Sequence, residues 1–400
     1  MLDEVAIGRI VYEAIDLVNA RSVHEFRVPP DTYIGPGALT RIGPALSARQ
    51  RQRVFVMIDE HLENLDLADG MYRSFAAAGL AWEIYRQCQG EPDSTAVDEA
   101  LGHLKRAACD SIVAFGGGSA IDAAKVTAIL AANPELSLAD LAEGAQPRNP
   151  RLPFVAVPTT AGTGSEATDV AVITDSKAGV KRVIANSGLI PDLAIIDACL
   201  TLGVPPAITA ATGIDALTHA VEAYLSPRAT PLTNALAYRA ITLIGESLPV
   251  AVGQGGDVNA REAMALASYM AGMAFSNAGL GLCHAMSHQL GAHYHIPHGT
   301  ANAVLLPSVM QFNLLVCRKR YPEIGLALCG HPMAAQEVID TISQLIVDIG
   351  LPGNLKMAGA DARDFPGLAD YALADSCLMT NPRTADRQQI IDVFAHALDR

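Results

Sequence analysis

The chain has 400 residues, of which 50% are hydrophobic and 18% are charged, so it can bury a large core and is not an intrinsically disordered protein. The 42 Asp and Glu residues outnumber the 28 Lys and Arg residues, and no block rich in Lys or Arg stands out, which disfavours a nucleic-acid partner. No apolar run approaches the roughly 18 to 20 residues that span a bilayer, and the N-terminus lacks the basic region of a secretory signal. We therefore expect a cytoplasmic protein that binds neither nucleic acid nor a membrane.

The first predicted element is an amphipathic helix within residues 1–22. Its apolar residues recur at spacings of three and four and form one stripe, with polar and charged residues on the opposite side. The stripe consists of Ile7, Ile10, Val11, Ala14, Leu17 and Val18. Two interpretations stay open: the helix packs on the chain's own core, or the prolines at 29 and 30 separate it from the domain so that it binds a partner protein. The acidic polar face disfavours a membrane surface.

Short apolar runs in the first half predict the strands of a parallel sheet. They cover residues 54–58, 111–115, 154–157 and 193–196. A helical pattern follows the second run, from Ser119 to about Leu130, and strands that alternate with helices predict an α/β domain. We place this domain at residues 23–205, with a surface connection rich in Pro and Arg at 144–153.

After Pro205 and Pro206 the pattern becomes helical throughout. Long stretches rich in Ala and Leu carry helical periodicity, and glycines or an Asn-Pro pair interrupt them as loops. These stretches cover residues 207–225, 231–250, 260–277, 280–294 and 335–349. The second half, residues 206–400, is therefore predicted to be an all-α domain.

A turn of three glycines, at 116–118, lies between the second strand and its helix. Glycines let the backbone approach a ligand closely, and the positive end of the following helix suits a pyrophosphate. Ser119 could cap this helix, which continues through Asp122. The turn does not match the G-x-G-x-x-G fingerprint, and a plain connection between strand and helix stays the alternative.

Two further strand ends carry polar residues. The third strand is followed by a loop dense in hydroxyls and glycines, residues 158–166, which indicates a ligand-lining loop or, alternatively, a simple turn. Asp59 ends the first strand, where it could accept hydrogen bonds from an adenosine ribose and repel a 2′-phosphate, favouring NAD over NADP. A solvated loop aspartate is the alternative. Ligands of open parallel sheets bind at the carboxyl ends of the strands, where all these residues are expected to lie. Each polar loop therefore strengthens the interpretation of the others as part of a binding site.

The helical half carries a cluster of possible metal ligands. Asp215 and His219 are four residues apart and so project from one helix face. Five of the eleven histidines fall between His284 and His298, and one carboxylate with several imidazoles suits Fe²⁺ or Zn²⁺. The alternative is a set of structural histidines. The seven cysteines are scattered, odd in number and never spaced C-x-x-C, which excludes a disulfide framework and a thiolate metal site.

These residues resemble the signatures of the iron-containing (group III) alcohol dehydrogenase family, and the likeness covers residues 24–400. The signatures are Asp197 through Pro205 to GIDALTHAVE (213–222), and GLCHAMSHQLGAHYHIPHG (281–299). The resemblance implies an α/β dinucleotide-binding domain followed by an all-α metal-binding domain. It implies a metal, Fe²⁺ or Zn²⁺, held by Asp215, His219, His284 and His298. It also implies NAD(H) bound by Asp59, Gly117, Gly118, Ser119, Asp122, Thr159, Thr160, Thr163 and Lys181.

The resemblance places His288 near the nicotinamide, where we expect it to relay a proton, and it assigns no ligand role to His293 or His295. Within the family the likeness is closest to the branch that serves ethanolamine utilisation, through residues 27–30, 56–57, 271–275 and 381–384. That branch reduces acetaldehyde to ethanol with NADH inside a bacterial microcompartment. The expected partners are accordingly a small aldehyde or alcohol, a second copy of the chain, and a microcompartment shell protein that binds residues 1–20.

Other functions stay open at this stage. A related dehydrogenase could act on 1-propanol, propanediol, butanol or glycerol, and a metal-stapled structural protein would need no catalysis. Dehydroquinate synthase shares the fold, but its phosphorylated substrate calls for basic residues, and residues 281–299 contain neither Arg nor Lys.

Overall fold

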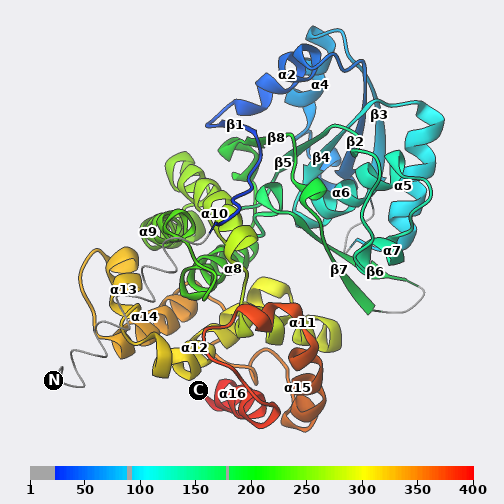
Figure 1. The fold of residues 1–400 in the computed structure, drawn as a ribbon. Coiled ribbons are helices and arrows are strands. Elements are labelled where there is room, and N and C mark those ends of the chain that lie inside the picture. The colour runs from blue at the N-terminus through cyan, green and yellow to red at the C-terminus, as the bar shows by residue number, and fades with distance from the viewer. Residues whose placement is uncertain (1–22, 88–91, 177–179) are drawn as a thin grey trace, which may run out of the picture.

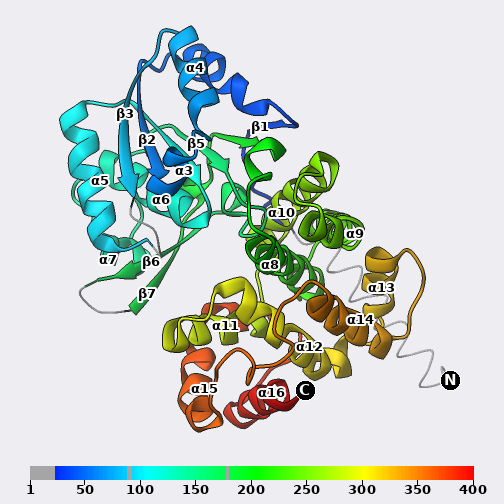
Figure 2. The ribbon, with the colours of Figure 1, turned by 180° about the vertical axis from the view of Figure 1, so that it is seen from behind.

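The computed structural model describes residues 23–87, 92–176 and 180–400. A parallel sheet with its helices forms the first half of the chain, and a body of helices forms the second (Figure 1). The view from behind shows the same division, with α8 and α10 between the sheet and the remaining helices (Figure 2). The helix predicted within residues 1–22 lies outside the described residues.

Six parallel strands form the main sheet in the order β1-β8-β5-β4-β2-β3. Their bounds are β1 Asp31–Ile34, β2 Arg53–Asp59, β3 Ala81–Gln87, β4 Ser111–Gly116, β5 Phe154–Pro158 and β8 Leu193–Ile196. The four predicted runs are confirmed as β2, β4, β5 and β8, which lie in the interior of the sheet and are therefore apolar on both faces. The sequence analysis missed β1 and β3 because these edge strands are only partly buried and lack a continuous apolar run.

Helices cover both faces of this sheet. On one face, α2 (Ile42–Ala48) and α4 (Asp69–Ala77) pack over Val54, Val56 and Val113. On the other face, α5 (Ser94–Ala107) and α6 (Gly118–Ala132) pack over Phe55 and Met57. Shorter helices are η1 (Ala38–Arg41), α3 (Glu60–Asn64), α7 (Leu138–Ala142), η2 (Ser165–Ala167), η3 (Ser187–Leu189) and η4 (Ala198–Thr201). An antiparallel hairpin, β6 (Val170–Asp175) and β7 (Val180–Ala185), was not predicted.

The prediction that Ser119 caps α6 is wrong. The helix begins at Gly118, with Gly117 as its N-cap residue, and it has no side-chain cap. Ser119 lies within the first turn instead. Because glycine has no side chain, the cap residue Gly117 offers no acceptor to the first backbone N–H groups of α6.

The second half is helical, as predicted. Its helices are α8 (Pro206–Leu225), α9 (Pro231–Gly253), α10 (Val258–Ala278), α11 (Leu282–Tyr294), α12 (His298–Cys317), α13 (Tyr321–Cys329), α14 (Ala335–Asp348), η5 (Ala362–Asp364), α15 (Phe365–Ala374), η6 (Ser376–Thr380) and α16 (Arg387–Asp399). By length and mean hydropathy, α9 and α12 could also cross a membrane, but core helices of soluble folds pass the same test. The apolar window is 67% buried inside the molecule in α12 and 39% buried in α9.

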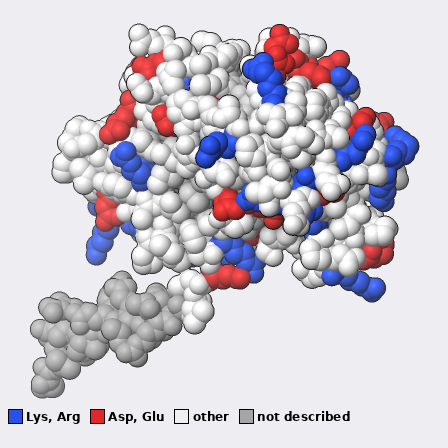
Figure 3. Space-filling view, turned by 90° about the horizontal axis from the view of Figure 1, so that it is seen from above, with Lys and Arg blue, Asp and Glu red and all other residues white. Residues whose placement is uncertain are grey.

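The surface carries charges of both signs. In the view from above, Lys and Arg side chains lie interspersed with Asp and Glu over a largely uncharged face (Figure 3). No broad basic field is visible on this face, in keeping with the formal net charge of −14.

Two glycines join the polar loop of residues 158–166 to the helical half. Gly164 adopts φ +62°, and a Cβ placed on it would lie 2.7 Å from Cα of Gly272 on α10. A Cβ on Gly272 would in turn lie 2.7 Å from the carbonyl oxygen of Gly164. Both distances are too short for a real Cβ, so only two glycines allow this contact of backbone with backbone. The contact fixes the loop against α10.

Gly272→Ala is therefore expected to lower the free energy of unfolding by about 1–3 kcal/mol, because the methyl group forces the loop away from the helix. Gly253→Ala is the control, since nothing lies within 4 Å of a Cβ there, and it should change stability by less than about 0.5 kcal/mol. Urea unfolding of both variants measures the difference. Equal stability of the two variants would contradict the proposed contact.

Candidate metal centre

Four side chains from three helices converge in the helical half. Asp215 and His219 come from α8, His284 from α11 and His298 from the first position of α12. One ligand atom from each lies within 4.8 Å of the others. From Asp215 Oδ1, the Nε2 atoms of His219, His284 and His298 lie 3.8, 3.8 and 3.5 Å away. The structure thus brings together all four residues predicted to bind metal.

Local sequence explains the convergence. Asp215 and His219 are one turn apart on α8, a helix buried over most of its length, so both face the same neighbours. The chain reverses after α11 through His295, which adopts φ 56°, and Pro297 is the N-cap residue of α12. The reversal brings the ring of His298 close to that of His284, with the centroids 5.3 Å apart.

The donor set fits a divalent cation. Four ligands around one ion at bond lengths of about 2.0–2.2 Å lie about 3.3–3.6 Å apart, close to the observed separations. Moreover, the amide nitrogen of Asn302 lies 2.7 Å from Asp215 Oδ1 and 3.2 Å from Nε2 of both His284 and His298. The Asn302 amide therefore lies where Asp215 Oδ1 and the two ring nitrogens converge, which is the place that a cation would occupy.

The titration behaviour of the cluster agrees with such a role. Burial alone would raise the pKa of Asp215, but the imidazoles of His219, His298 and His284 hold it well below its usual range. Burial lowers the pKa of His219 to about 4 and that of His298 to about 3, so both rings are neutral at pH 7. The carboxylate and these two imidazoles therefore offer lone pairs.

His284 differs from the other two histidines. Burial would lower its pKa as well, but hydrogen bonds to Asp215 and Glu222 outweigh that effect and raise the pKa to about 9. At pH 7 the metal-free ring therefore carries an extra proton between the two carboxylates. A cation bound at the cluster competes with that proton.

His288, the predicted proton relay, lies beside the cluster. Its ring stacks on that of His298, with centroids 5.4 Å apart, and its Nδ1 lies 2.8 Å from Asp375 Oδ2. Cys377 completes a second group of possible ligand atoms with these two residues. Asp375 was not predicted to belong to the site, because it caps η6 just as Asp361 caps η5, and the local sequence pattern does not distinguish the two residues.

The predicted cofactor loops lie side by side at the carboxyl ends of β4 and β5. The backbone N–H of Thr159 donates to the carbonyl of Gly116 at 3.0 Å. A Cβ on Gly118 would lie 2.8 Å from Thr163 Cγ2, and one on Gly117 would lie 3.4 Å from Thr160 Oγ1. The glycine turn and the hydroxyl-rich loop thus form one continuous polar surface.

Three further residues predicted to bind the cofactor have contacts of their own. Asp122 accepts hydrogen bonds from Ser165 Oγ and the Val172 N–H, so both of its oxygens already bind the chain. Asp59 ends β2 and caps α3 through the His61 N–H at 2.7 Å. Lys181 lies on β7, with its Nζ 3.7 Å from where a Cβ on Gly291 would be, so the hairpin reaches α11.

Comparison with known proteins agrees with this geometry. The sequence profile described as iron-containing alcohol dehydrogenase matches residues 29–198, and the profile of the C-terminal domain of the same family matches residues 209–398. The chain is 51% identical to the probable alcohol dehydrogenase EutG of Salmonella typhimurium, over 97% of this chain and 98% of that one. It is 39% identical to an NAD-dependent methanol dehydrogenase of Bacillus methanolicus, over 93% and 99%.

Among solved structures, a 1,3-propanediol oxidoreductase superposes with a TM-score of 0.91 at 39% identity, covering 94% of this chain and 100% of that chain. Profile, sequence and structure therefore agree over both halves of the molecule. The chain belongs to the iron-containing alcohol dehydrogenase family.

Proposed function

We propose that this alcohol dehydrogenase uses NAD(H) and a bound divalent metal to reduce acetaldehyde to ethanol. The observation that carries the proposal is the buried cluster of one carboxylate and three imidazoles, with a fourth histidine, His288, stacked beside it. A relative named as NAD-dependent, at 39% identity, supports the choice of NAD. The likeness to the ethanolamine-utilisation branch supports acetaldehyde as the substrate.

Each group has a separate task in the proposed reaction. When bound, the metal supplies a Lewis acid for the carbonyl oxygen and the nicotinamide supplies the hydride. Asp375 holds the Nδ1 side of His288, which leaves Nε2 as the atom that exchanges a proton with the substrate oxygen, directly or through water. The burial of Asp215, His219 and His284 keeps water from most of the ligand atoms.

The assay follows oxidation of NADH at 340 nm with acetaldehyde, using protein purified without oxygen and supplied with Fe²⁺ or Zn²⁺. His284→Ala is expected to reduce metal content by at least about tenfold and to abolish turnover, while NADH binding persists in the other half of the chain. His293→Ala, an exposed histidine on the same helix, is the control and should retain metal and activity. Normal metal content and turnover in His284→Ala would contradict the ligand assignment.

A panel of aldehydes in the same assay tests the substrate. Acetaldehyde should give the highest kcat/KM, and a clear preference for a larger or hydroxylated aldehyde would transfer the proposal to that substrate. If the protein binds metal but no aldehyde in the panel supports oxidation of NADH, the result would favour a non-catalytic, metal-stapled structural protein.

Asp59 is proposed to select NAD. Its carboxylate ends β2 at the edge of the sheet where the cofactor loops lie, and its charge would repel a 2′-phosphate. Asp59→Gly should lower the ratio of kcat/KM for NADH to that for NADPH by at least about tenfold, whereas Glu60→Gln, which removes the neighbouring exposed charge, should leave the ratio unchanged. A wild type that already prefers NADPH would contradict this role.

The N-terminal segment is proposed to direct the enzyme to a microcompartment shell. The described chain starts at the surface, because Val23 is fully exposed while the backbone of Arg27 pairs with the Asn277 side chain on α10. An amphipathic stripe preceding this point suits a helix-in-groove contact with a shell protein.

Deletion of residues 1–20 should preserve specific activity and abolish co-purification with shells. Residues 1–22 fused to a fluorescent protein should conversely carry it into shells, and loss of solubility or activity on deletion would favour packing on the enzyme.

A further inference from the structure

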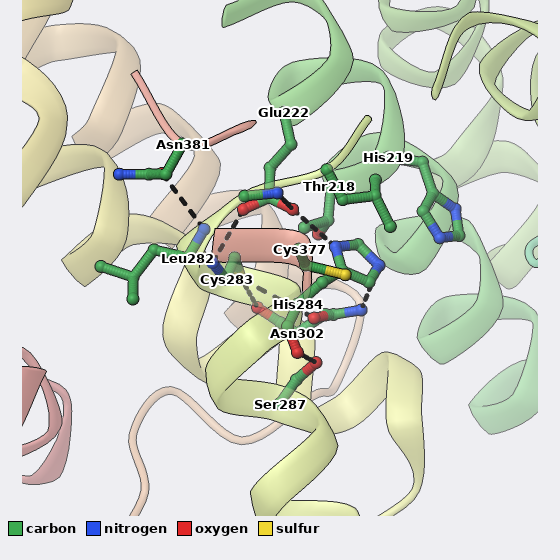
Figure 4. A network of polar contacts seen from close by, with 12 residues as sticks. Thr218, His219, Glu222, Leu282, Cys283, His284, Ser287, Asn302, Cys377 and Asn381 are labelled. Carbon is green, nitrogen blue, oxygen red and sulfur yellow. Dashed lines mark hydrogen bonds and ion pairs between the residues drawn. The ribbon is translucent and has the colours of Figure 1, made fainter. Parts of the chain in front are cut away.

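Glu222 is a buried carboxylate next to the metal centre. It lies on α8, three residues after His219, and only 6% of its surface is exposed. Among the described residues, no Lys or Arg forms an ion pair with it. Instead it accepts three hydrogen bonds: from the Cys283 N–H at 2.7 Å, from the Gly281 N–H at 3.0 Å and from His284 Nδ1 at 2.6 Å (Figure 4).

These bonds cap the helix that carries His284. The N-cap residue of α11 is Gly281, which has no side chain to satisfy the first N–H groups. Glu222 accepts two of them, and Asn381 accepts the intervening Leu282 N–H at 3.1 Å. A Cβ on Gly281 would lie 2.8 Å from Glu222 Oε1 and 2.9 Å from Asn381 Oδ1, so a side chain here would displace both acceptors. The carboxylate lies at the positive end of the helix, a favourable place for an acidic side chain.

The contact with His284 has a consequence for its chemistry. Both carboxylate oxygens of Glu222 already accept backbone N–H groups, so in the contact with Oε2 the Nδ1 atom of His284 is the donor and carries the proton. The second ring nitrogen, Nε2, then faces Asp215 and Asn302 and can offer its lone pair to a cation. Because Glu222 also holds the backbone at 281 and 283, the ring is fixed in position relative to α8.

His219 shows the same arrangement with a weaker acceptor. Its Nδ1 lies 3.2 Å from the carbonyl oxygen of Gly162, in the polar loop of the first half. Its Nε2 faces Asp215 at 3.8 Å. Two of the three histidine ligands are therefore held at Nδ1, one by a backbone carbonyl and one by a charged side chain.

We propose that Glu222 is a positioning residue that holds His284 in the tautomer and orientation needed to bind the metal through Nε2. The inference rests on the proposed metal-dependent function and extends it beyond the four ligands. Partners of this kind typically change metal affinity by about 10–100-fold when they are removed.

The test compares Zn²⁺ affinity with stability. Glu222→Gln should raise the Kd for Zn²⁺, measured by competition with a chromophoric chelator, by about 10–100-fold. Asn381→Ala is the matched control, because it removes a cap from the same helix end without touching His284, and it should change the Kd by less than about threefold. Urea unfolding of the metal-free variants reports the loss of the cap separately from the loss of metal affinity.

The outcomes separate this proposal from the proposed function. Equal weakening of Zn²⁺ binding in both variants, or wild-type affinity in Glu222→Gln, would show that Glu222 only caps the helix and would overturn the inference alone. A wild type that binds no Zn²⁺ would contradict both proposals.

A second measurement uses the wild type alone. In Zn²⁺-loaded protein labelled with ¹³C and ¹⁵N, the ring signals of His284, assigned through their bonds to the backbone, should show a proton on Nδ1 and metal on Nε2. Metal coordination through Nδ1 would overturn the inference.

Discussion

The proposed metal centre depends on one electrostatic constraint: a carboxylate and several imidazole nitrogens face one point in the interior of the helical half. Asp215 is almost fully buried, and among the described residues the groups that hold its pKa down are the imidazoles of His219, His298 and His284. Without a cation, the cluster relies on the extra proton of His284 and on the amide of Asn302. A divalent ion would place its positive charge at the point of convergence, in place of that extra proton. The packing of α8, α11 and α12 serves to hold this arrangement.

The polar loop of residues 158–166, in the first half of the chain, contacts the helical half next to the four proposed ligands. The Gly162 carbonyl, in the loop that we assign to the cofactor, accepts a hydrogen bond from the ring of His219, a proposed metal ligand. Two residues further on, Gly164 touches Gly272 on α10 with no side chain between the backbones. The loop between strand and helix is thus fixed to the metal-binding helices at two points. This contact gives a physical reason why a cofactor on the loop and a substrate at the metal would keep a constant separation.

Sequence reasoning was strongest where residue type and spacing alone determine geometry. The spacing of Asp215 and His219 places both on one helix face, and continuous apolar runs identified the interior strands. The partners of the ligands were harder to identify. Glu222 was part of a recognised motif, but its role depends on the start of α11, a helix that is distant in sequence, and on the absence of a side chain at Gly281. Asn302 and Asp375 reach the site through tertiary packing that no local pattern encodes.

The central claim is that Asp215, His219, His284 and His298 bind one divalent ion. A crystal structure of the Zn²⁺-loaded protein, with anomalous diffraction recorded on both sides of the zinc absorption edge, tests it most directly. The account predicts one strong anomalous peak within about 2.0–2.2 Å of Asp215 and of Nε2 of the three histidines. A peak only at His288, Asp375 and Cys377, or no peak within bonding distance of His284, would contradict it.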